Sequence, residues 1–414
     1  MNWHRAQIDQ VAPAKVSGLR FSTDEKVWNL TLDQIISNTG EVIEKKYLKV
    51  SEAGNSTYNF DEGNVLYSKL RPYLNKVICP DEPGIATTEL VPLRPNPEIL
   101  SRYFLAYYLR SSTFLSFANL VVAGAKMPRM IMSKFRNHEI SIPSLSEQRR
   151  IVEILDQADA VRKQRAEGDT KTARILPTIF YKIFGDPAVN PKGWNLGKVD
   201  DVVLETQYGT STRANTDEKG IPILRMNNIE YDGQLNLSKL KHIVLPSKGQ
   251  IKYKLLAGDI LFNRTNSKEL VGKTGLWQGE MEAVAASYLI RARINTKIAY
   301  PEFIWAYMNC SFIKQMLQNK CRRAIGMANI NAKELRGLPL IIPPKDIQLK
   351  FVNHFSIIHQ MRIKQSLLGE TIEQLFSTLL YQAFTGELTS SWRESHMNEL
   401  LQEMETQSKV LGEN

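Results

Sequence analysis

The sequence has few cysteines and histidines and lacks long apolar runs. Its 414 residues include three cysteines and six histidines. None of Cys79, Cys310 and Cys321 belongs to a C-x-x-C pair, which argues against a disulfide framework or a zinc knuckle. No apolar run approaches the roughly 18 residues of a membrane span, and the N-terminal residues carry no signal-peptide pattern. We therefore expect a cytoplasmic protein that does not associate with membranes.

The sequence also lacks the motifs of the enzymes that act on nucleic acids. Gly272-Lys273-Thr274 is the end of a Walker pattern, but Ser267 stands where the earlier glycine is required. A methyltransferase would need an N-P-P-Y-like tetrapeptide, and the nearest candidate, 190–193, reads NPKG. His354 and His359 are interpreted as interface or solvent groups rather than metal ligands. We expect no catalytic centre in this chain, no metal site and no bound cofactor.

The amount of apolar and charged residues is typical of a soluble globular protein of two or more domains. Apolar residues make up 43% of the chain and charged residues 23%, and the formal net charge is +10. The positive excess is concentrated in residues 188–342, which contain 22 Lys and Arg against 13 Asp and Glu. A basic segment of this kind indicates a polyanionic partner.

The sequence contains an internal repeat with an offset of 200 residues. The segment beginning at Ile142 aligns with the segment beginning at Ile342, and it pairs Gln148 with Gln348 and Arg162 with Arg362. The same offset still pairs Thr178 with Thr378 and Phe184 with Phe384. An unbroken register over about forty residues predicts two copies of one structural element.

Both copies are predicted to be long helices. Ser144 or Ser146 can cap the first helix ahead of Glu147, and apolar residues then recur at helical spacing in both copies. Pro177 lies inside the first copy, where it removes a hydrogen bond, so we expect a kink or break there. The second copy has Ser377 instead and is expected to be straighter. Two unrelated helical hairpins remain the alternative interpretation.

The segments between the helices resemble each other faintly. Residues 63–67 (GNVLY) match 258–262 (GDILF), and each is followed by a polar, basic stretch. Residues 126–135 also resemble 326–335, with Met127 aligned to Met327. Alternating apolar runs such as 221–224 and 283–294 predict strands, and short helices are predicted near 103–109 and 303–308.

These observations predict an α+β protein with an internal two-fold-like repeat. Two mixed α/β recognition domains are separated by two long antiparallel helical regions. The predicted segments are recognition domain 1 at 1–142, helical region 1 at 143–187, recognition domain 2 at 188–342, helical region 2 at 343–390 and an acidic extension at 391–414. For the extension a solvated helix is the expectation.

This order of segments resembles the specificity subunit of type I restriction-modification systems. The resemblance covers nearly the whole chain and rests on 142–149 (IPSLSEQR), 180–187 (FYKIFGDP), 258–267 (GDILFNRTNS), 384–388 (FTGEL) and 392–394 (WRE). It implies a non-catalytic subunit in which each recognition domain binds one half of a split, asymmetric target in double-stranded DNA. The helices then set the distance between the half-sites.

The resemblance also implies partners. They are two copies of an adenine-N6 methyltransferase subunit and an ATP-dependent restriction and translocase subunit. S-adenosylmethionine, ATP and Mg are accordingly expected in the partner subunits. Two alternatives stay open: a DNA binder that acts without partners, and a nuclease or methyltransferase with an unrecognised centre.

Candidate DNA contacts are basic and amide side chains in the segments between the helices. Lys and Arg suit phosphates, whereas the forked groups of Arg, Asn and Gln suit base edges. Aligned positions across the repeat favour Lys69, Arg71, Arg264 and Asn266. The full set is Lys69, Arg71, Tyr73, Lys76, Lys126, Arg129, Arg225, Asn227, Asn228, Arg264, Asn266, Lys273, Arg322, Arg323 and Asn329.

Overall fold

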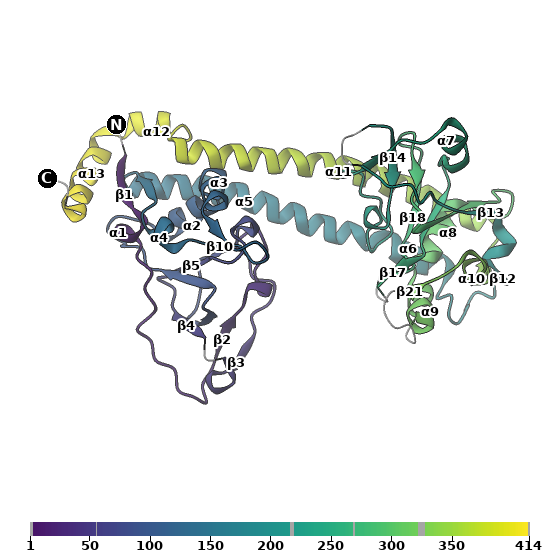
Figure 1. Cartoon of the computed structure of the whole chain (residues 1–414), viewed down its shortest axis with the longest axis horizontal. Coiled ribbons are helices and arrows are strands. Elements are labelled where there is room, and N and C mark those ends of the chain that lie inside the picture. The colour runs from purple at the N-terminus through teal and green to yellow at the C-terminus, as the bar shows by residue number, and fades with distance from the viewer. Residues whose placement is uncertain (1–2, 55, 216–218, 268–269, 322–327, 413–414) are drawn as a thin grey trace. The chain divides into compact units, whose positions relative to one another are not determined.

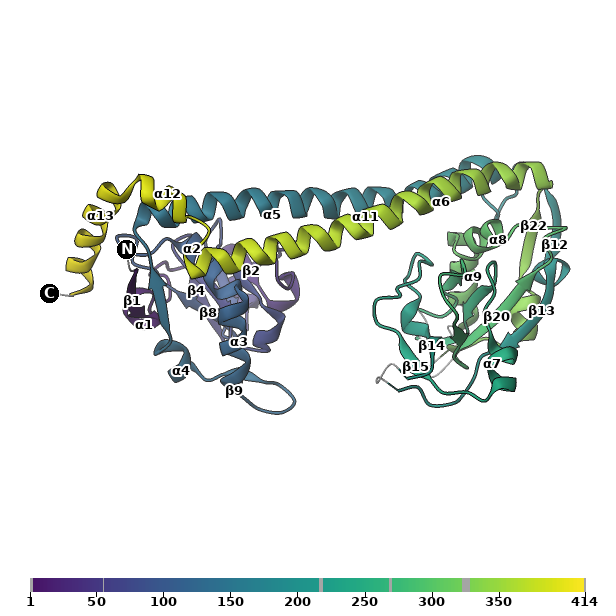
Figure 2. The ribbon, with the colours of Figure 1, turned by 90° about the horizontal axis from the view of Figure 1, so that it is seen from above.

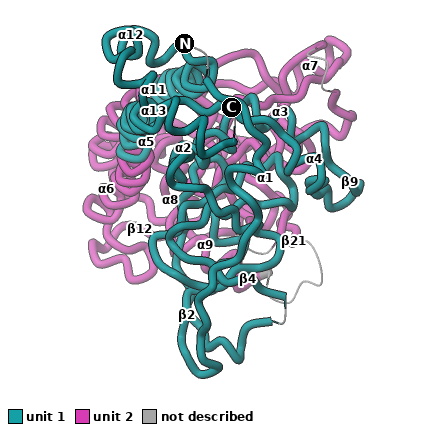
Figure 3. Tube along the Cα trace, turned by 90° about the vertical axis from the view of Figure 1, so that its left-hand side faces the viewer, with its two compact units in different colours: residues 1–165, 368–414 teal, residues 166–367 magenta. Residues whose placement is uncertain are grey.

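A computed structural model describes residues 3–54, 56–215, 219–267, 270–321 and 328–412. The chain divides into two compact units that both mix helices and strands (Figure 3). Unit 1 contains Met1–Arg165 and Leu368–Asn414, and unit 2 contains Ala166–Leu367. In the described part of the chain, no helix combines the length and the apolar character needed to cross a membrane.

Neither unit coincides with one of the predicted domains. The long helices α5 (Leu145–Ala173) and α11 (Lys345–Thr385) each contribute residues to both units. Each unit therefore combines one predicted recognition segment with a part of each long helix. These helix parts are distant in sequence but pack together.

The strands of unit 1, of which Figure 1 labels several, form small sheets with the orders β3-β2-β7-β4, β6-β5-β8, β1-β11 and β10-β9. All pairs are antiparallel except β2 with β7. The strands are β1 (His4–Gln7), β2 (Lys26–Leu30), β3 (Tyr47–Lys49), β4 (Thr57–Phe60), β5 (Val65–Ser68), β6 (Val77–Ile78), β7 (Gly84–Thr87), β8 (Leu90–Leu93), β9 (Val122–Ala123), β10 (Arg129–Met130) and β11 (Glu139–Ile142).

Helices of unit 1 share one apolar core with strands of the smaller sheets, whereas the β3-β2-β7-β4 sheet packs in a second core around Trp28 and Phe60. Buried Phe104 of α2, Tyr67 of β5, Leu155 of α5 and Leu380 of α11 belong to the first core. Besides its parts of α5 and α11, the unit has α1 (Ile8–Val11), α2 (Arg102–Arg110), α3 (Ser112–Leu120), α4 (Met132–Arg136), α12 (Ser390–Ser395) and α13 (Met397–Leu411), and the 3-10 turns η1 (Leu32–Gln34), η2 (Val50–Glu52) and η3 (Pro72–Leu74).

Unit 2 has sheets with the orders β13-β20-β16-β18, β15-β14-β19, β12-β22 and β17-β21. The strands are β12 (Asn195–Lys198), β13 (Val203–Tyr208), β14 (Ile221–Leu224), β15 (Lys241–Ile243), β16 (Ile260–Asn263), β17 (Thr265–Asn266), β18 (Thr274–Leu276), β19 (Val284–Ala285), β20 (Leu289–Ile294), β21 (Ala328–Asn329) and β22 (Pro339–Ile342). The helices are α6 (Ile175–Phe184), α7 (Ser247–Tyr253), α8 (Pro301–Met308), α9 (Ser311–Cys321) and α10 (Ala332–Arg336), with turns η4 (Val199–Val202) and η5 (Met226–Asn228).

The two units follow the same plan. In each, the first strand pairs with the last, β1 with β11 and β12 with β22, and Figure 2 shows the second of these pairs. Each also has one parallel pair, β2 with β7 and β14 with β19. The repeat-related glutamines make the same bonds: the Gln148 amide donates to the carbonyls of Ile99 (2.7 Å) and Pro143 (2.9 Å). The Gln348 amide donates to those of Ile298 (3.2 Å) and Pro343 (2.8 Å).

The parts of α5 and α11 within a unit are antiparallel. In unit 1, Arg162 of α5 bonds Glu373 of α11 at 2.9 Å, and Glu147 bonds Thr389 beyond the end of α11 at 2.6 Å. In unit 2, Thr172 of α5 bonds Gln365, and the ring of Phe184 lies 5.8 Å from that of Phe351 near the start of α11. Early residues of one helix thus meet late residues of the other.

The first long helix is interrupted as the proline predicts. It ends at Ala173, and α6 begins at Ile175, two residues before Pro177. Pro177 has no backbone N–H, so the carbonyl of Ala173 lacks a donor for an i to i−4 bond. The second copy runs unbroken from Lys345 to Thr385.

The acidic C-terminal extension is not the solvated helix that was expected. Helix α13 packs on unit 1 and buries Leu400, Met404 and Gln407. The Glu403 carboxylate accepts from the backbone N–H of Ser146 at 2.9 Å, and the Gln407 amide donates to Ile99 and Pro143. The expectation was wrong because the tail's apolar residues form one face of a helix, which meets the start of α5 and β1 only in the tertiary structure.

Candidate nucleic-acid interface

In each unit, a basic residue directly follows a central strand, and we call this position the polar strand end. The two residues make equivalent backbone hydrogen bonds. In unit 1, Lys69 follows β5; its N–H donates to Glu89 at 3.0 Å, and its carbonyl accepts from Met130 at 2.8 Å. In unit 2, Arg264 follows β16; its N–H donates to Tyr288 at 3.0 Å, and its carbonyl accepts from Ile330 at 2.9 Å. Lys69 and Arg264 are therefore structurally equivalent, as the sequence repeat suggests.

In unit 1 this strand end lies against the hairpin of β9 and β10. The Arg71 N–H donates to Pro128 at 2.7 Å, and Leu70 forms a bridge with Arg129. Arg71 has a φ of 49°, a left-handed conformation, and its side chain is exposed. Tyr73 (51% exposed) follows on η3, and exposed Lys126 lies in the hairpin loop. The fold thus brings Lys69, Arg71 and Arg129 together, and Tyr73 and Lys126 lie in the adjoining segments.

Arg129 is held by a carboxylate that the sequence did not single out. Its Nη2 lies 2.8 Å from Oε1 of Glu89, and its Nε lies 3.1 Å from the same oxygen. Glu89 also supplies the carbonyl that bonds Lys69. The carboxylate therefore orients one candidate side chain and neutralises part of the charge of this surface.

In unit 2 the equivalent surface is built from β17 and β21. Thr265 pairs with Asn329, and the Thr265 hydroxyl donates to the Asn329 side-chain oxygen at 3.3 Å. The Arg264 guanidinium lies over the ring of Tyr208, 4.8 Å from its centroid. The half-buried Asn266 accepts from the Ser267 N–H at 2.9 Å. Arg264, Asn266 and Asn329 are thus neighbours, whereas Arg322 and Arg323 lie outside the described residues.

Three predicted contact residues make hydrogen bonds to the backbone of their own unit. The Lys76 ammonium donates to the carbonyl of Leu32 at 2.6 Å, and the equivalent Lys273, 9% exposed, donates to that of Ile229. Burial lowers the pKa of Lys273. Asn228 is buried and bonds the N–H of Arg225. These side chains satisfy backbone groups inside the unit, so their placement does not favour contact with DNA.

The remaining predicted residues lie at the turn η5, with Asn227 in the turn and Arg225 directly before it. Asn227 is exposed and Arg225 is half-buried. Their side chains remain candidates, although the same turn contributes buried Asn228 to the interior. Tyr208, Tyr288 and Glu89 were missed, because each reaches the strand end from a distant part of the sequence.

The structure gives the tripeptide 272–274 no nucleotide-binding geometry. Lys273 is turned into the unit, and Thr274 begins β18 and is fully buried. Among the described residues, no group of three or more His, Cys, Asp or Glu side chains is placed to hold a metal ion.

Known proteins resemble the chain over most of its length. The family model described as the type I restriction modification DNA specificity domain matches residues 1–168 and 191–374, one match for each recognition segment. The specificity subunit of the type I restriction enzyme EcoKI from Escherichia coli (strain K12) is 28% identical over 325 residues, which are 73% of this chain and 68% of that protein. The StySPI specificity subunit from Salmonella potsdam is 25% identical over 321 residues, with the same coverage.

Two solved structures share the fold. A chain from a structure on complex assembly and conformational transition of the type I R-M system has a TM-score of 0.54 at 17% identity, and 94% of this chain and 98% of that chain are covered. The S subunit of a type I restriction-modification system from M. genitalium has a TM-score of 0.53 at 13% identity, with 92% and 96% covered. The family predicted from the helical motifs is confirmed: the chain belongs to the type I restriction-modification DNA specificity family and is a sequence-specific DNA-recognition subunit rather than a catalytic one.

Proposed function

We propose that each unit binds one half of a split, asymmetric DNA target through its polar strand end. The observation that carries the proposal is the identical backbone setting of Lys69 and Arg264, with bonds to Met130 and Ile330 on the neighbouring strand segments. The same backbone arrangement with different side chains suits two domains that recognise different base sequences. Because the chain contains an internal repeat, both strand ends can then contact one duplex.

The two surfaces offer different chemistry to DNA. Unit 1 presents Lys69, Arg71 and Lys126, whose cationic groups suit phosphates, with exposed Tyr73 beside them. Unit 2 presents Arg264, held over Tyr208, together with Asn266 and Asn329, whose forked or amide groups suit base edges. Arg225 and Asn227 are further candidates in unit 2, and Arg129, with its bond to Glu89, is one in unit 1.

The long helices are proposed as the docking surface for the catalytic subunits. Each unit leaves apolar helix side chains in solvent: Ile357 and Leu367 of unit 2 are each 60% exposed, and Leu368 and Leu375 of unit 1 are 53% and 55% exposed. Apolar residues repeated along a helix mark an interaction surface. We assign this surface to two copies of an adenine-N6 methyltransferase subunit, with an ATP-dependent restriction and translocase subunit joining the complex. S-adenosylmethionine, ATP and Mg then belong to these partners.

Mapping of N6-methyladenine in the source cell tests the proposal. Deletion of the gene should remove one split methylated motif from the genome, and restoration of the gene should restore the same motif. A methylation map that is unchanged by the deletion would contradict it. DNA hydrolysis or methyl transfer by the isolated chain would favour an unrecognised catalytic centre instead. Tight, specific binding without any methyltransferase partner would favour a binder that acts alone.

A further inference from the structure

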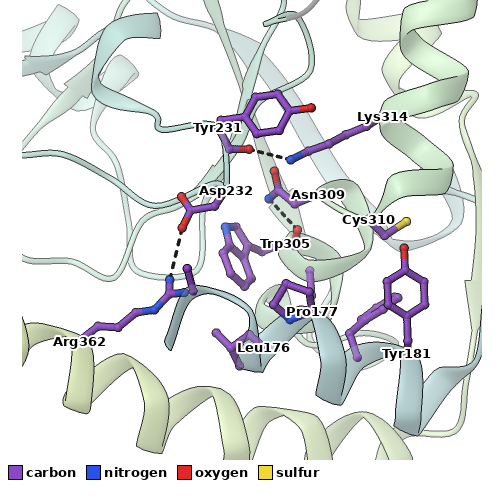
Figure 4. A pocket seen from close by; sticks show the side chains of 13 residues that line it. Leu176, Pro177, Tyr181, Tyr231, Asp232, Trp305, Asn309, Cys310, Lys314 and Arg362 are labelled. Atoms are coloured by element: carbon purple, nitrogen blue, oxygen red, sulfur yellow. Dashed lines mark hydrogen bonds and ion pairs between the residues drawn. The ribbon is translucent and has the colours of Figure 1, made fainter. Parts of the chain in front are cut away.

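Unit 2 contains a cavity of about 240 Å³ between α6, α8 and the turn at 231–233. Its walls are mainly apolar and include Leu176, Pro177, Phe180 and the buried Trp305. Figure 4 shows Leu176, Pro177 and Trp305 around this space. Its polar groups include Lys314, Arg362 and Asp232, whose side chains Figure 4 shows around the same space. No step of DNA recognition described above uses this cavity.

The repeat places an equivalent cavity of about 250 Å³ in unit 1. Under the offset of 200 residues, Phe376, Ser377 and Leu380 of its lining correspond to Leu176, Pro177 and Phe180. Arg162 corresponds to Arg362 in the same way. The two cavities are therefore equivalent parts of the repeat, so the charged groups around Arg162 and Arg362 can be compared directly.

In unit 1 the chain's own carboxylates neutralise the arginine. Arg162 bonds Glu373 at 2.9 Å through two nitrogens and Asp159 at 3.0 Å. Burial alone would lower the pKa of Arg162, but the bonds to Glu373 and Asp159 raise it. The cation of this copy already has two anionic partners.

In unit 2 both carboxylates are missing from the equivalent positions. Under the offset of 200 residues, Ala173 of unit 2 corresponds to Glu373 of unit 1, and His359 of unit 2 corresponds to Asp159 of unit 1. Arg362 keeps a 3.6 Å ion pair with the exposed Asp232 and a 3.5 Å bond to the carbonyl of Thr172. Burial lowers the pKa of Arg362, in contrast to Arg162.

A second cation also lines the unit 2 cavity. The Lys314 ammonium donates to the carbonyl of Tyr231 at 2.6 Å and lies 4.0 Å from the centroid of its ring. In the described part of the chain, no carboxylate forms an ion pair with Lys314, and burial lowers its pKa. Among the residues that line the cavity, Arg362 and Lys314 are cationic and Asp232 is anionic, while Asp169 acts on Arg362 from outside the lining. The lining itself thus has one more positive than negative side chain, and both cations are partly desolvated.

We propose that the unit 2 cavity binds a small organic anion, a carboxylate on a flat apolar body of about one ring. An apolar cavity of roughly 150 Å³ accommodates benzene, so 240 Å³ suffices for a ring with a carboxylate. The apolar walls would contact the ring, and the carboxylate would balance the charge of Arg362 and Lys314. Entry is from a neighbouring groove of about 630 Å³, which shares Ala173, Pro177 and Tyr181 with the cavity.

Calorimetric titration of the full chain tests this site. Benzoate is the probe, and benzyl alcohol is its neutral counterpart of similar size. We expect benzoate to bind with a dissociation constant in the millimolar range or lower, at least about tenfold tighter than benzyl alcohol. A change in Trp305 fluorescence that is absent in Trp305→Phe should accompany binding. Equal affinity for the two compounds would overturn the proposal.

The repeat supplies the decisive variant. Ala173→Glu introduces the carboxylate that unit 1 has at Glu373, and it should weaken benzoate binding at least tenfold by pairing with Arg362. Lys320→Met, at an exposed position of α9, lowers the net charge by the same amount and should leave binding unchanged. Thermal unfolding of both variants separates loss of the site from loss of the fold. Unchanged benzoate binding in Ala173→Glu would contradict the assignment.

A blocked Glu-Phe dipeptide distinguishes the source of the anion. Preferred binding of benzoate assigns the site to a free aromatic acid, whereas preferred binding of the dipeptide assigns it to an acidic polypeptide segment. Binding of either compound supports the anion site if that binding is lost in Ala173→Glu. Failure of both compounds to bind would overturn it. The inference is independent of the DNA-binding proposal, whose methylation readout does not involve this cavity.

Discussion

Lys69 and Arg264 occupy the same backbone position in the two candidate DNA-binding surfaces. Their main-chain bonds are equivalent, but the Arg129–Glu89 pair lies beside Lys69, whereas the ring of Tyr208 lies under Arg264. A guanidinium held over an aromatic ring loses little conformational freedom when it contacts a base, because the ring already restricts it. Arg264 is therefore the best single candidate for base recognition in unit 2.

Replacement of Arg264 tests this role. Arg264→Ala should weaken binding to the cognate DNA by about 1–3 kcal/mol, roughly 5- to 150-fold, and Arg264→Lys should make one position of the methylated motif degenerate. Lys248→Ala, at an exposed position of α7, removes the same charge and serves as the control. Titrations at several salt concentrations and methylation maps are the measurements. Equal effects of Arg264→Ala and Lys248→Ala would contradict the assignment.

Lys273 should behave in the opposite way. Lys273→Met removes the ammonium that bonds the Ile229 carbonyl and leaves that acceptor without its partner inside the unit. The expected cost is about 1–3 kcal/mol in the free energy of unfolding. Denaturant unfolding measures it, and the base sequence of the target should not change. A relaxed target at unchanged stability would show that Lys273 contacts DNA after all.

At the residue scale, sequence reasoning paired two strand ends that have equivalent backbone bonds in the structure, but it did not give the direction of every side chain. Lys69, Arg71, Arg264 and Asn266 were selected as candidates because they follow matching apolar strands in the repeat. Lys76 and Lys273 follow the same strands and carry the same charge, yet both donate to backbone carbonyls of a neighbouring segment. Residue type and spacing cannot separate these cases, since the acceptors at Leu32 and Ile229 are about 44 residues away.

At the scale of elements, the long helices followed from periodicity and from one proline. Apolar spacing predicted both copies, and Pro177 predicted the break that separates α5 from α6. The register between the helices could not be predicted from apolar spacing or from Pro177. It depends on long-range pairs such as Arg162 with Glu373 and Thr172 with Gln365.

Lengthening the helices tests whether they set the gap between half-sites. Four residues inserted within Ala166 to Thr172 of α5, with four more between Gln365 and Gly369 of α11, add about 6 Å of helix. This corresponds to roughly two base pairs, and the gap in the methylated motif should widen accordingly while both half-sites stay the same. Methylation mapping provides the readout. A motif with the original gap would eliminate the helices as the spacing element.

The C-terminal helix α13 should stabilise unit 1. Deletion of residues 397–414 exposes the surface that buried Leu400 and Met404 cover and removes the Glu403 bond to Ser146. We expect a loss of about 3 kcal/mol in the free energy of unfolding, from the burial of two apolar side chains. Glu405→Ala, at an exposed position of α13, should have little effect. Unchanged thermal unfolding of the truncated chain would show that the extension does not contribute.

At the scale of the whole molecule, the duplicated plan predicts that the two recognition segments act separately. Exchange of residues 188–342 for the corresponding segment of a relative should change one half of the methylated motif and leave the other half and the gap intact. The reason is that β12 and β22 enclose the segment as one antiparallel pair, so its ends lie side by side. Sequencing of methylated adenines gives the result. Loss of both half-sites would contradict separate recognition.

The sequence by itself determined the family, the repeat, the helix break and the strand ends that carry the candidate contacts, because each is encoded by local spacing or by a short motif. The tertiary structure decided which cations lie at the surface, that α13 packs on unit 1, and that Arg162 bonds two carboxylates whereas Arg362 keeps one longer ion pair, with Asp232. Those outcomes depend on partners tens to hundreds of residues away. Only the folded chain brings such groups within bonding distance, where desolvation and charge pairing act on them.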